Sequence, residues 1–147
     1  MDFTYEAIAK TIDHSLLNPT LTWTDLERGC HLARDYQVAS VCIMPFAVKH
    51  CAEILKGSGV KTGTTIGFPH GGHTTETKLA EAMAAIDDGG EELDMVINIS
   101  KALSGDWAYV RHDIHHLTHA IHARGAKLKV IFENCYLNDH QKIALCE

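Results

Sequence analysis

The sequence predicts a parallel α/β fold, because short apolar runs alternate along the chain with segments of helical periodicity. Each run has about the length of a β-strand. Each is also almost continuously apolar, as is typical of parallel strands covered on both faces. The runs lie at 40–44, 64–68, 93–97 and 128–132. Right-handed crossovers leave two architectures open, a doubly wound open sheet and a curling barrel.

Helix signals fill the intervals between the runs. Helices are expected over about 24–36, 46–56, 74–88 and 107–124, and from Asn138 onward. Thr24 with Glu27 has the form of a capping box, and Asp106 can cap the fourth helix through its carboxylate. Gly57 and Gly125 follow the last residues of two helical patterns, where glycine commonly ends a helix.

Length and composition limit the class of protein. The chain has 147 residues, of which 46% are hydrophobic, enough for one globular domain that is expected to span 1–147. A complete (β/α)₈ barrel needs at least about 200 residues. The chain is therefore too short for a full barrel.

Charge and cysteine content argue against several partners and compartments. A net charge of −6, from 13 basic and 19 acidic residues, disfavours nucleic acid and anionic membranes as partners. No apolar stretch reaches the roughly 18 residues of a transmembrane helix, and the acidic residues 1–6 lack the apolar core of a signal peptide. Five cysteines without CxxC spacing indicate reduced thiols and a cytoplasmic location. They are Cys30, Cys42, Cys51, Cys135 and Cys146.

Two charged residues interrupt strands that are otherwise apolar. Asp94 and Lys129 each stand inside such a run, where a lone charge costs several kcal/mol unless it is paired or reaches water. The two strands are expected to be consecutive in the sheet, so each residue can be the partner of the other. Two interpretations stay open: a structural buried ion pair, or a functional pair in a cleft with mutually shifted pKa values.

A stripe of histidines follows one face of the helix expected over 107–124. Its members fall within an arc of roughly 120° at 100° per residue, and they are His112, His115, His116, His119 and His122. The opposite face carries the apolar residues Val110, Ile114, Leu117 and Ile121. The stripe is therefore expected to be solvated, with no functional metal site, although pairs four residues apart can ligate a metal.

Other polar residues have simple explanations in terms of structure. His70 and His73 flank two glycines and are expected on a strand-to-helix loop that holds no metal. Cys42 is expected to be a small core residue, and Lys61 a solvated lysine at the start of a strand. Asp13 is explained equally well as the cap of an N-terminal turn.

Five segments in order resemble the deoxyribose-phosphate aldolase family, whose members are class I aldolases on a (β/α)₈ barrel. The segments are IDHSLLNP at 12–19, ASVCIMP at 39–45, VK at 60–61 leading to IGFPHG at 66–71, ELDMVIN at 92–98 and LKVIFE at 128–133. The resemblance implies a partial (β/α)₈ TIM barrel of about five parallel strands, at 11–17, 40–45, 62–68, 92–98 and 127–133.

The resemblance also implies a chemistry and a set of site residues. Members of the family reversibly cleave 2-deoxyribose 5-phosphate to acetaldehyde and glyceraldehyde 3-phosphate. They use a Schiff base on a sixth-strand lysine and need no metal or organic cofactor. By position, Asp94 corresponds to the aspartate of the proton relay and Lys129 to the strand-five lysine that lines the site. The substrate pocket residues are Asp13, Ser15, Leu17 and Cys42.

The 147 residues lack the K-T-S-T-G motif that carries the Schiff-base lysine in this family. The sequence stops inside the helix after strand five, so a truncated chain that is inactive alone is expected. The KTGT at 61–64 belongs to the start of strand three. Two alternatives stay open: a non-catalytic remnant that binds a small molecule or self-assembles, and a weak aldolase with Lys129 as a surrogate amine. The expected partners are a sugar phosphate or aldehyde, together with a second copy or a complementing C-terminal fragment that covers the open sheet edges.

Overall fold

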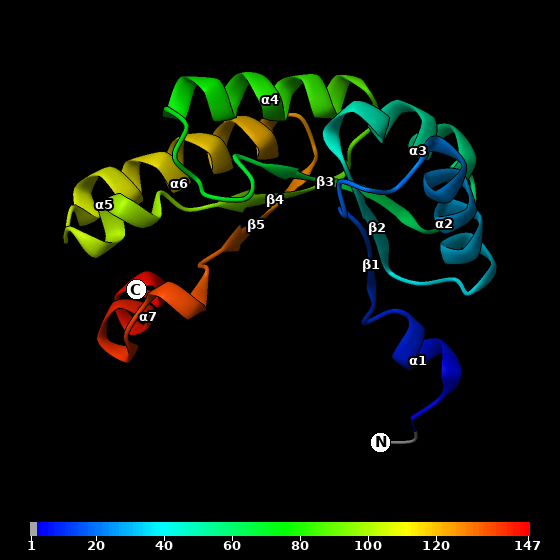
Figure 1. Cartoon of the computed structure of the whole chain (residues 1–147), viewed down its shortest axis with the longest axis horizontal. Helices are drawn as coiled ribbons and strands as arrows, with labels where there is room; N and C mark the ends of the chain where they lie inside the picture. The colour runs from blue at the N-terminus through cyan, green and yellow to red at the C-terminus, as the bar shows by residue number, and fades with distance from the viewer. Residues whose placement is uncertain (1–2) are drawn as a thin grey trace. The chain divides into compact units, whose positions relative to one another are not determined.

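A computed structural model describes residues 3–147 (Figure 1). Met1 and Asp2, which begin the acidic N-terminal stretch, lie outside the described residues. The strands are β1 (Asp13–Leu16), β2 (Ser40–Ile43), β3 (Lys61–Ile66), β4 (Glu92–Val96) and β5 (Lys127–Ile131). They form one sheet in the order β1-β2-β3-β4-β5, and the β1–β2 and β2–β3 pairs are parallel. The prediction of about five parallel strands is confirmed.

The expected helices are all present, and two short ones add to them. The helices are α1 (Tyr5–Ala9), α2 (Trp23–Asp35), α3 (Val48–Leu55), α4 (Thr75–Asp87), α5 (Ile99–Leu103), α6 (Trp107–Ala123) and α7 (Asp139–Cys146), with 3₁₀ turns η1 (Pro45–Ala47) and η2 (Asn134–Tyr136). Asp106 caps α6 by accepting from the backbone N of Tyr109, as predicted. Neither α1 nor α5 was predicted, because five residues are too few to show a helical period.

The prediction of the first capping box was wrong by two residues. The cap of α2 is Thr22, whose backbone N donates to Asp25 at 3.0 Å while Asp25 N donates to the Thr22 hydroxyl at 3.3 Å. Thr24 with Glu27 fits the same sequence pattern. However, Glu27 is used elsewhere, because its carboxylate lies 2.8 Å from the ring of His50 on α3.

The chain divides into two compact units, each with its own core. The first contains the residues up to Thr65 together with Ala85–Glu92. In it, α2 and α3 pack beside each other and against β1 and β2 (Figure 1). Their shared core includes Leu16, Leu26, Cys30, Val41, Ile43 and Val48. This unit places β1 and β2, and with them the predicted pocket residues, on a packed core.

The second unit contains Ile66–Ala84 and Leu93–Glu147. Its core brings the end of β4 together with α5 and α6, and it includes Val96, Ile97, Ile99, Ala102, Val110 and Leu137. The buried side of α6 carries Val110, Leu117 and Ile121, as its apolar period predicts, and also Asp113. This unit supports β4 and β5, which hold Asp94 and Lys129. The expectation of a single domain over 1–147 stays a prediction.

Candidate active site

Asp94 and Lys129 form the ion pair that their positions in the sequence predict. Each is the third residue of its strand, Asp94 in β4 and Lys129 in β5. The Lys129 Nζ atom lies 3.1 Å from the Asp94 Oδ2 atom. The two side chains differ in exposure, since 12% of Asp94 and 46% of Lys129 is accessible to solvent. The pair is therefore not a fully buried structural ion pair, because almost half of the lysine side chain is exposed.

A carboxylate that is largely buried beside a partly exposed lysine suits proton transfer. The carboxylate can accept a proton from a bound hydroxyl group, directly or through one water, and return it. The ammonium offsets the negative charge that the carboxylate carries inside the strand. The arrangement can thus supply acid–base chemistry.

The four predicted pocket residues lie in the first unit, on β1 and β2 or directly after β1. Ser15 and Cys42 are partners in the parallel register, and Asp13 lies opposite Ser40. The hydroxyl of Ser40 donates to the Asp13 carboxylate at 2.6 Å. This bond ties β1 to β2, so capping of a turn does not by itself account for Asp13. Asp13 and Ser15 are exposed, while Cys42 is buried as expected of a small core residue. Leu17, just beyond the end of β1, is half-buried.

A buried ion pair that the sequence analysis missed holds the end of β4. Lys78 on α4 and Asp113 on α6 are 0% and 1% exposed, and the Lys78 Nζ atom lies 2.7 Å from the Asp113 Oδ2 atom. Lys78 also donates to the backbone oxygen of Val96 at 2.9 Å, and the hydroxyl of Thr75 donates to Asp113 at 2.8 Å. Val96 is two residues beyond Asp94, so this network fixes the strand that carries the candidate proton acceptor.

The loop between β3 and α4 packs tightly on the same end of β4. Gly71 has φ +62°, and a Cβ atom at this position would lie 1.7 Å from the backbone oxygen of Ile97. Any side chain at residue 71 would collide with β4, so the close approach requires glycine. His70 and His73 on this loop are exposed. The prediction of a loop at this position is confirmed.

Lys61 begins β3, as the sequence predicts, and pairs with Glu91 at 2.5 Å between Nζ and Oε2. This hydrogen bond and the nearby carboxylate charge raise the pKa of Lys61 above its ordinary value. A nucleophilic amine needs the opposite shift, because only the uncharged amine attacks a carbonyl carbon. The ion pair with Glu91 thus disfavours Lys61 as a Schiff-base lysine.

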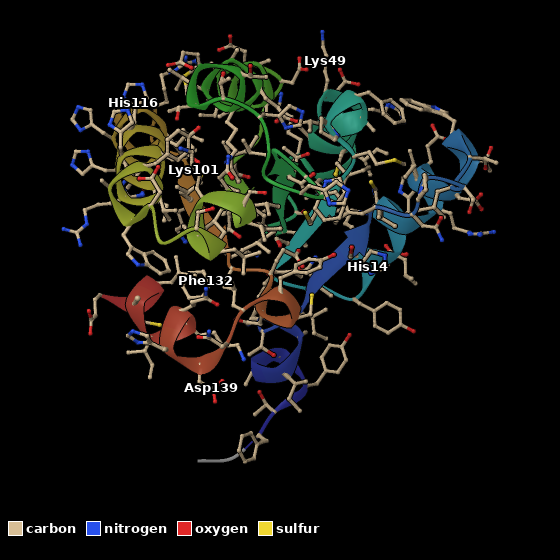
Figure 2. The ribbon with its side chains drawn as sticks, turned by 60° about the vertical axis from the view of Figure 1, so that its left-hand side comes forward. His14, Lys49, Lys101, His116, Phe132 and Asp139 are labelled. Atoms are coloured by element: carbon tan, nitrogen blue, oxygen red, sulfur yellow. The ribbon has the colours of Figure 1, made fainter. Side chains whose placement is uncertain are left out.

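The histidine stripe on α6 lies in solvent, as its position opposite the apolar face predicts. All five of its histidines are exposed, and the rings of His112 and His116 stack with their centroids 5.6 Å apart. Figure 2 shows His116 pointing outward from α6. Within residues 3–147, no three His, Cys, Asp or Glu side chains are grouped so that they could hold a metal ion. Over the same residues, no helix has the length and hydrophobicity of a membrane span.

The fold and the Asp94–Lys129 pair together define a parallel β/α protein with acid–base groups on consecutive strands. Comparison with known proteins identifies its family. The chain belongs to the DeoC/LacD family of aldolases, whose profile matches residues 7–144.

Two curated relatives illustrate the similarity. The chain is 61% identical over 146 residues to a deoxyribose-phosphate aldolase of Rhodopirellula baltica, covering 99% of the chain and 61% of that protein. It is 45% identical over 140 residues to a deoxyribose-phosphate aldolase of Aciduliprofundum boonei, covering 95% of the chain and 63% of that protein. The chain thus spans about three-fifths of the length of these relatives.

A solved structure supports the same fold. The tetrameric deoxyribose phosphate aldolase from Aeropyrum pernix matches with a TM-score of 0.87 at 29% identity, over 97% of this chain and 59% of that one. The prediction of a partial aldolase-type barrel with five parallel strands is confirmed by this match.

Proposed function

We propose that this chain supplies the proton-relay part of a 2-deoxyribose-5-phosphate aldolase, which cleaves its substrate reversibly to acetaldehyde and glyceraldehyde 3-phosphate. The observation that carries this proposal is the 3.1 Å contact between Asp94 and Lys129 in a member of the DeoC/LacD family. In this proposal Asp94 moves the proton of a substrate hydroxyl, and Lys129 lines the site and balances its charge. Asp13, Ser15, Leu17 and Cys42 line the substrate pocket.

The proposed reaction also needs an amine that these residues do not supply. A class I aldolase stores the electron pair of the broken carbon–carbon bond in an iminium ion, which forms when a neutral amine attacks the substrate carbonyl. Lys61 is held as an ammonium by Glu91, Lys78 is buried against Asp113, and Lys129 lies against Asp94. The Schiff-base lysine is therefore proposed to lie outside the 147 residues, and the chain alone to be inactive.

Imine trapping tests this proposal. The chain is incubated with acetaldehyde and reduced with borohydride, and the intact and peptide masses are compared with those of the full-length Rhodopirellula baltica relative treated in the same way. The expected result is a stoichiometric adduct on one lysine of the relative and no site-selective adduct on the chain. A stoichiometric adduct on Lys129, absent from the Lys129→Met variant, would instead establish a surrogate nucleophile.

Adding the rest of an aldolase as a second polypeptide distinguishes the proposed function from the alternative of a non-catalytic remnant. When the rest of the relative is provided as a second polypeptide, the proposal expects cleavage activity that Asp94→Asn lowers by at least about 100-fold, the usual contribution of a general acid–base group. Stable association without any turnover would favour the non-catalytic remnant, which binds a sugar phosphate or a partner and performs no chemistry.

The proposed partners follow from the surface of the chain. Strands β1 and β5 are the outer strands of the sheet, and unpaired strand edges recruit further strands. A second copy and a complementing C-terminal polypeptide both satisfy this requirement, and the Aeropyrum pernix relative is tetrameric. Sedimentation at micromolar concentration tests self-association, which a monodisperse monomer would contradict.

A further inference from the structure

The exposed face of α6 concentrates imidazoles and has no carboxylate of its own. Beyond the histidine stripe, its exposed residues are Ala108, Arg111 and Ala123. Asp113, the one acidic residue of this helix, is buried on the other side and paired with Lys78. Imidazole nitrogen is a preferred ligand of zinc and related transition metals. This face therefore carries the donor atoms of a metal site.

Two histidines of the stripe are arranged as a ligand pair. His112 and His116 are four residues apart, so they lie about one turn apart on the same face of the helix. Their ring centroids are 5.6 Å apart and the ring planes are inclined by 23°, and Figure 2 shows His116 directed away from α6. Both side chains are exposed, so each ring can turn one nitrogen towards the same ion. Histidines at this spacing supply two of the ligands in helical zinc sites.

A carboxylate on a second helix makes the same place favourable for a cation. Glu76 lies in the first turn of α4 and interacts electrostatically with His116 and His112. Hydrogen bonds from its own backbone N and from the Thr74 side chain are the main reasons that the pKa of Glu76 is below its ordinary value. Its carboxylate is therefore charged at neutral pH. A negative charge near two imidazoles attracts a divalent cation.

One chain offers too few ligands for a structural zinc ion. Such ions have four protein ligands in a tetrahedral arrangement, whereas His112 and His116 are two. Across residues 3–147, no three His, Cys, Asp or Glu side chains are grouped for metal binding. In a two-fold dimer the same patch of each copy faces the other. An ion on the two-fold axis therefore receives two imidazoles from each copy, which completes the set of four.

The charge of this face permits contact between two copies. On α6, all of whose residues the structure describes, Arg111 is the only exposed Asp, Glu, Lys or Arg. The chain as a whole has a net charge of −6. Two copies that approach through α6 therefore avoid most of the repulsion that their acidic residues produce elsewhere.

We propose that His112 and His116 of two copies of this chain bind one zinc ion between them and join the copies through α6. The site goes beyond the proposed function, since it uses neither Asp94 nor Lys129, and it is separate from the edges of the sheet. Four imidazoles leave no open position on the ion, so its role is structural. The proposal departs from the expectation of no functional metal site, because that expectation rested on the exposure of the stripe in one copy.

Zinc addition tests the proposal with the full chain, produced without a histidine tag. Molar mass is measured by sedimentation and bound zinc by atomic emission, first in EDTA and then after addition of zinc chloride and removal of the unbound metal. The expected result is a doubling of the molar mass with one zinc ion per two chains. Renewed addition of EDTA is expected to restore the initial mass.

Two double variants of α6 locate the ligands. His112→Asn combined with His116→Asn removes the proposed pair, and this protein is expected to bind no zinc and to keep the mass that it has in EDTA. His119→Asn combined with His122→Asn is the matched control, because it removes two exposed histidines of the same stripe and leaves the proposed pair. The control is expected to behave like the parent.

Four results would overturn the proposal. They are no bound zinc, one zinc per chain without a change of mass, a parent-like response of the variant that lacks His112 and His116, and loss of zinc from both double variants. The second result would mean adventitious binding to single chains. None of these results bears on the proposed aldolase function, which imine trapping tests separately.

Discussion

Two lysine–aspartate pairs in the second unit have similar geometry and different surroundings. Lys78 and Asp113 lie 2.7 Å apart and are fully buried, whereas Lys129 and Asp94 lie 3.1 Å apart and the lysine side chain of that pair is partly exposed. The buried pair also has a backbone oxygen and a threonine hydroxyl as partners. The two pairs therefore differ mainly in their exposure to water. The buried, dry pair holds the end of β4, whereas proton exchange with a ligand is proposed for the partly exposed, wet pair.

The largest effect is expected from breaking the dry pair. Lys78→Met removes the ammonium and leaves the Asp113 carboxylate buried without its counter-charge. Loss of one partner of a buried ion pair typically costs about 3–5 kcal/mol of unfolding free energy. Urea unfolding followed by circular dichroism measures the change.

A double variant serves as the control for this prediction. Lys78→Met combined with Asp113→Leu removes both charges, and it is expected to recover most of the lost stability, because an apolar pair of similar volume often replaces a buried ion pair without cost. A Lys78→Met protein that unfolds like the parent would contradict the structural role of the pair.

A smaller effect is expected from breaking the wet pair. Lys129→Met should lower the unfolding free energy by about 1–3 kcal/mol, less than Lys78→Met, because Lys129 is partly exposed although the Asp94 carboxylate that loses its partner is largely buried. Added salt distinguishes the two ion pairs further, because it screens exposed charges and screens buried charges much less. Unfolding in low and in molar sodium chloride is expected to shrink the effect of Lys129→Met and to leave that of Lys78→Met unchanged. If salt changed the unfolding free energies of both variants equally, the distinction between a buried and a partly exposed pair would be contradicted.

The smallest effect is expected at a third pair, Lys101 and Asp106, which lies on the surface at 2.7 Å. The hydrogen bond from Lys101, followed by the one from the backbone N of Tyr109, holds the pKa of Asp106 below its ordinary value. The folded protein thus binds the proton of Asp106 less readily than the unfolded chain. The stabilisation is complete above the unfolded value of about 4 and is lost as the pH falls through the folded pKa.

Asp106→Asn provides the test at this third pair. It removes the titration and keeps a side chain that can cap α6. Between pH 2 and pH 6, the melting temperature of the variant should therefore fall slightly less steeply with decreasing pH than that of the parent. A steeper fall of the melting temperature in the variant would contradict the lowered pKa of Asp106.

The strands and the Asp94–Lys129 contact were predictable because the apolar runs leave little room for charge, although only β4 of these two strands is buried and β5 is partly exposed along its length. A charged residue inside an apolar run of five is conspicuous, and two such residues of opposite sign on neighbouring strands point to each other. The helix boundaries were less certain, because Thr22 and Thr24 both satisfy the capping pattern and only the contact of Glu27 with His50 separates them.

The sequence contains one sign of the Lys78–Asp113 pair, which is a charged residue on the apolar face of α6. Asp113 lies three residues after Val110 and four before Leu117, so it shares their face of α6. A charge on a buried helix face requires an opposite charge nearby, but the sequence alone does not say which helix supplies it. An apolar groove lined by α1, β1 and the second half of α2 was beyond sequence analysis for another reason, because α1 is too short to show a period and the groove forms only when α1 meets α2 and β1.

The strand order has a consequence for how the chain acquires its structure. Neighbours in the sheet are neighbours in the sequence, so Asp13 finds its partner Ser40 27 residues away and Ile43 finds Thr64 21 residues away. Short separations of this kind keep the entropy lost in closing each loop small for a parallel sheet. The strand order is compatible with growth of the sheet in the direction of synthesis, because each strand pairs with the strand made before it.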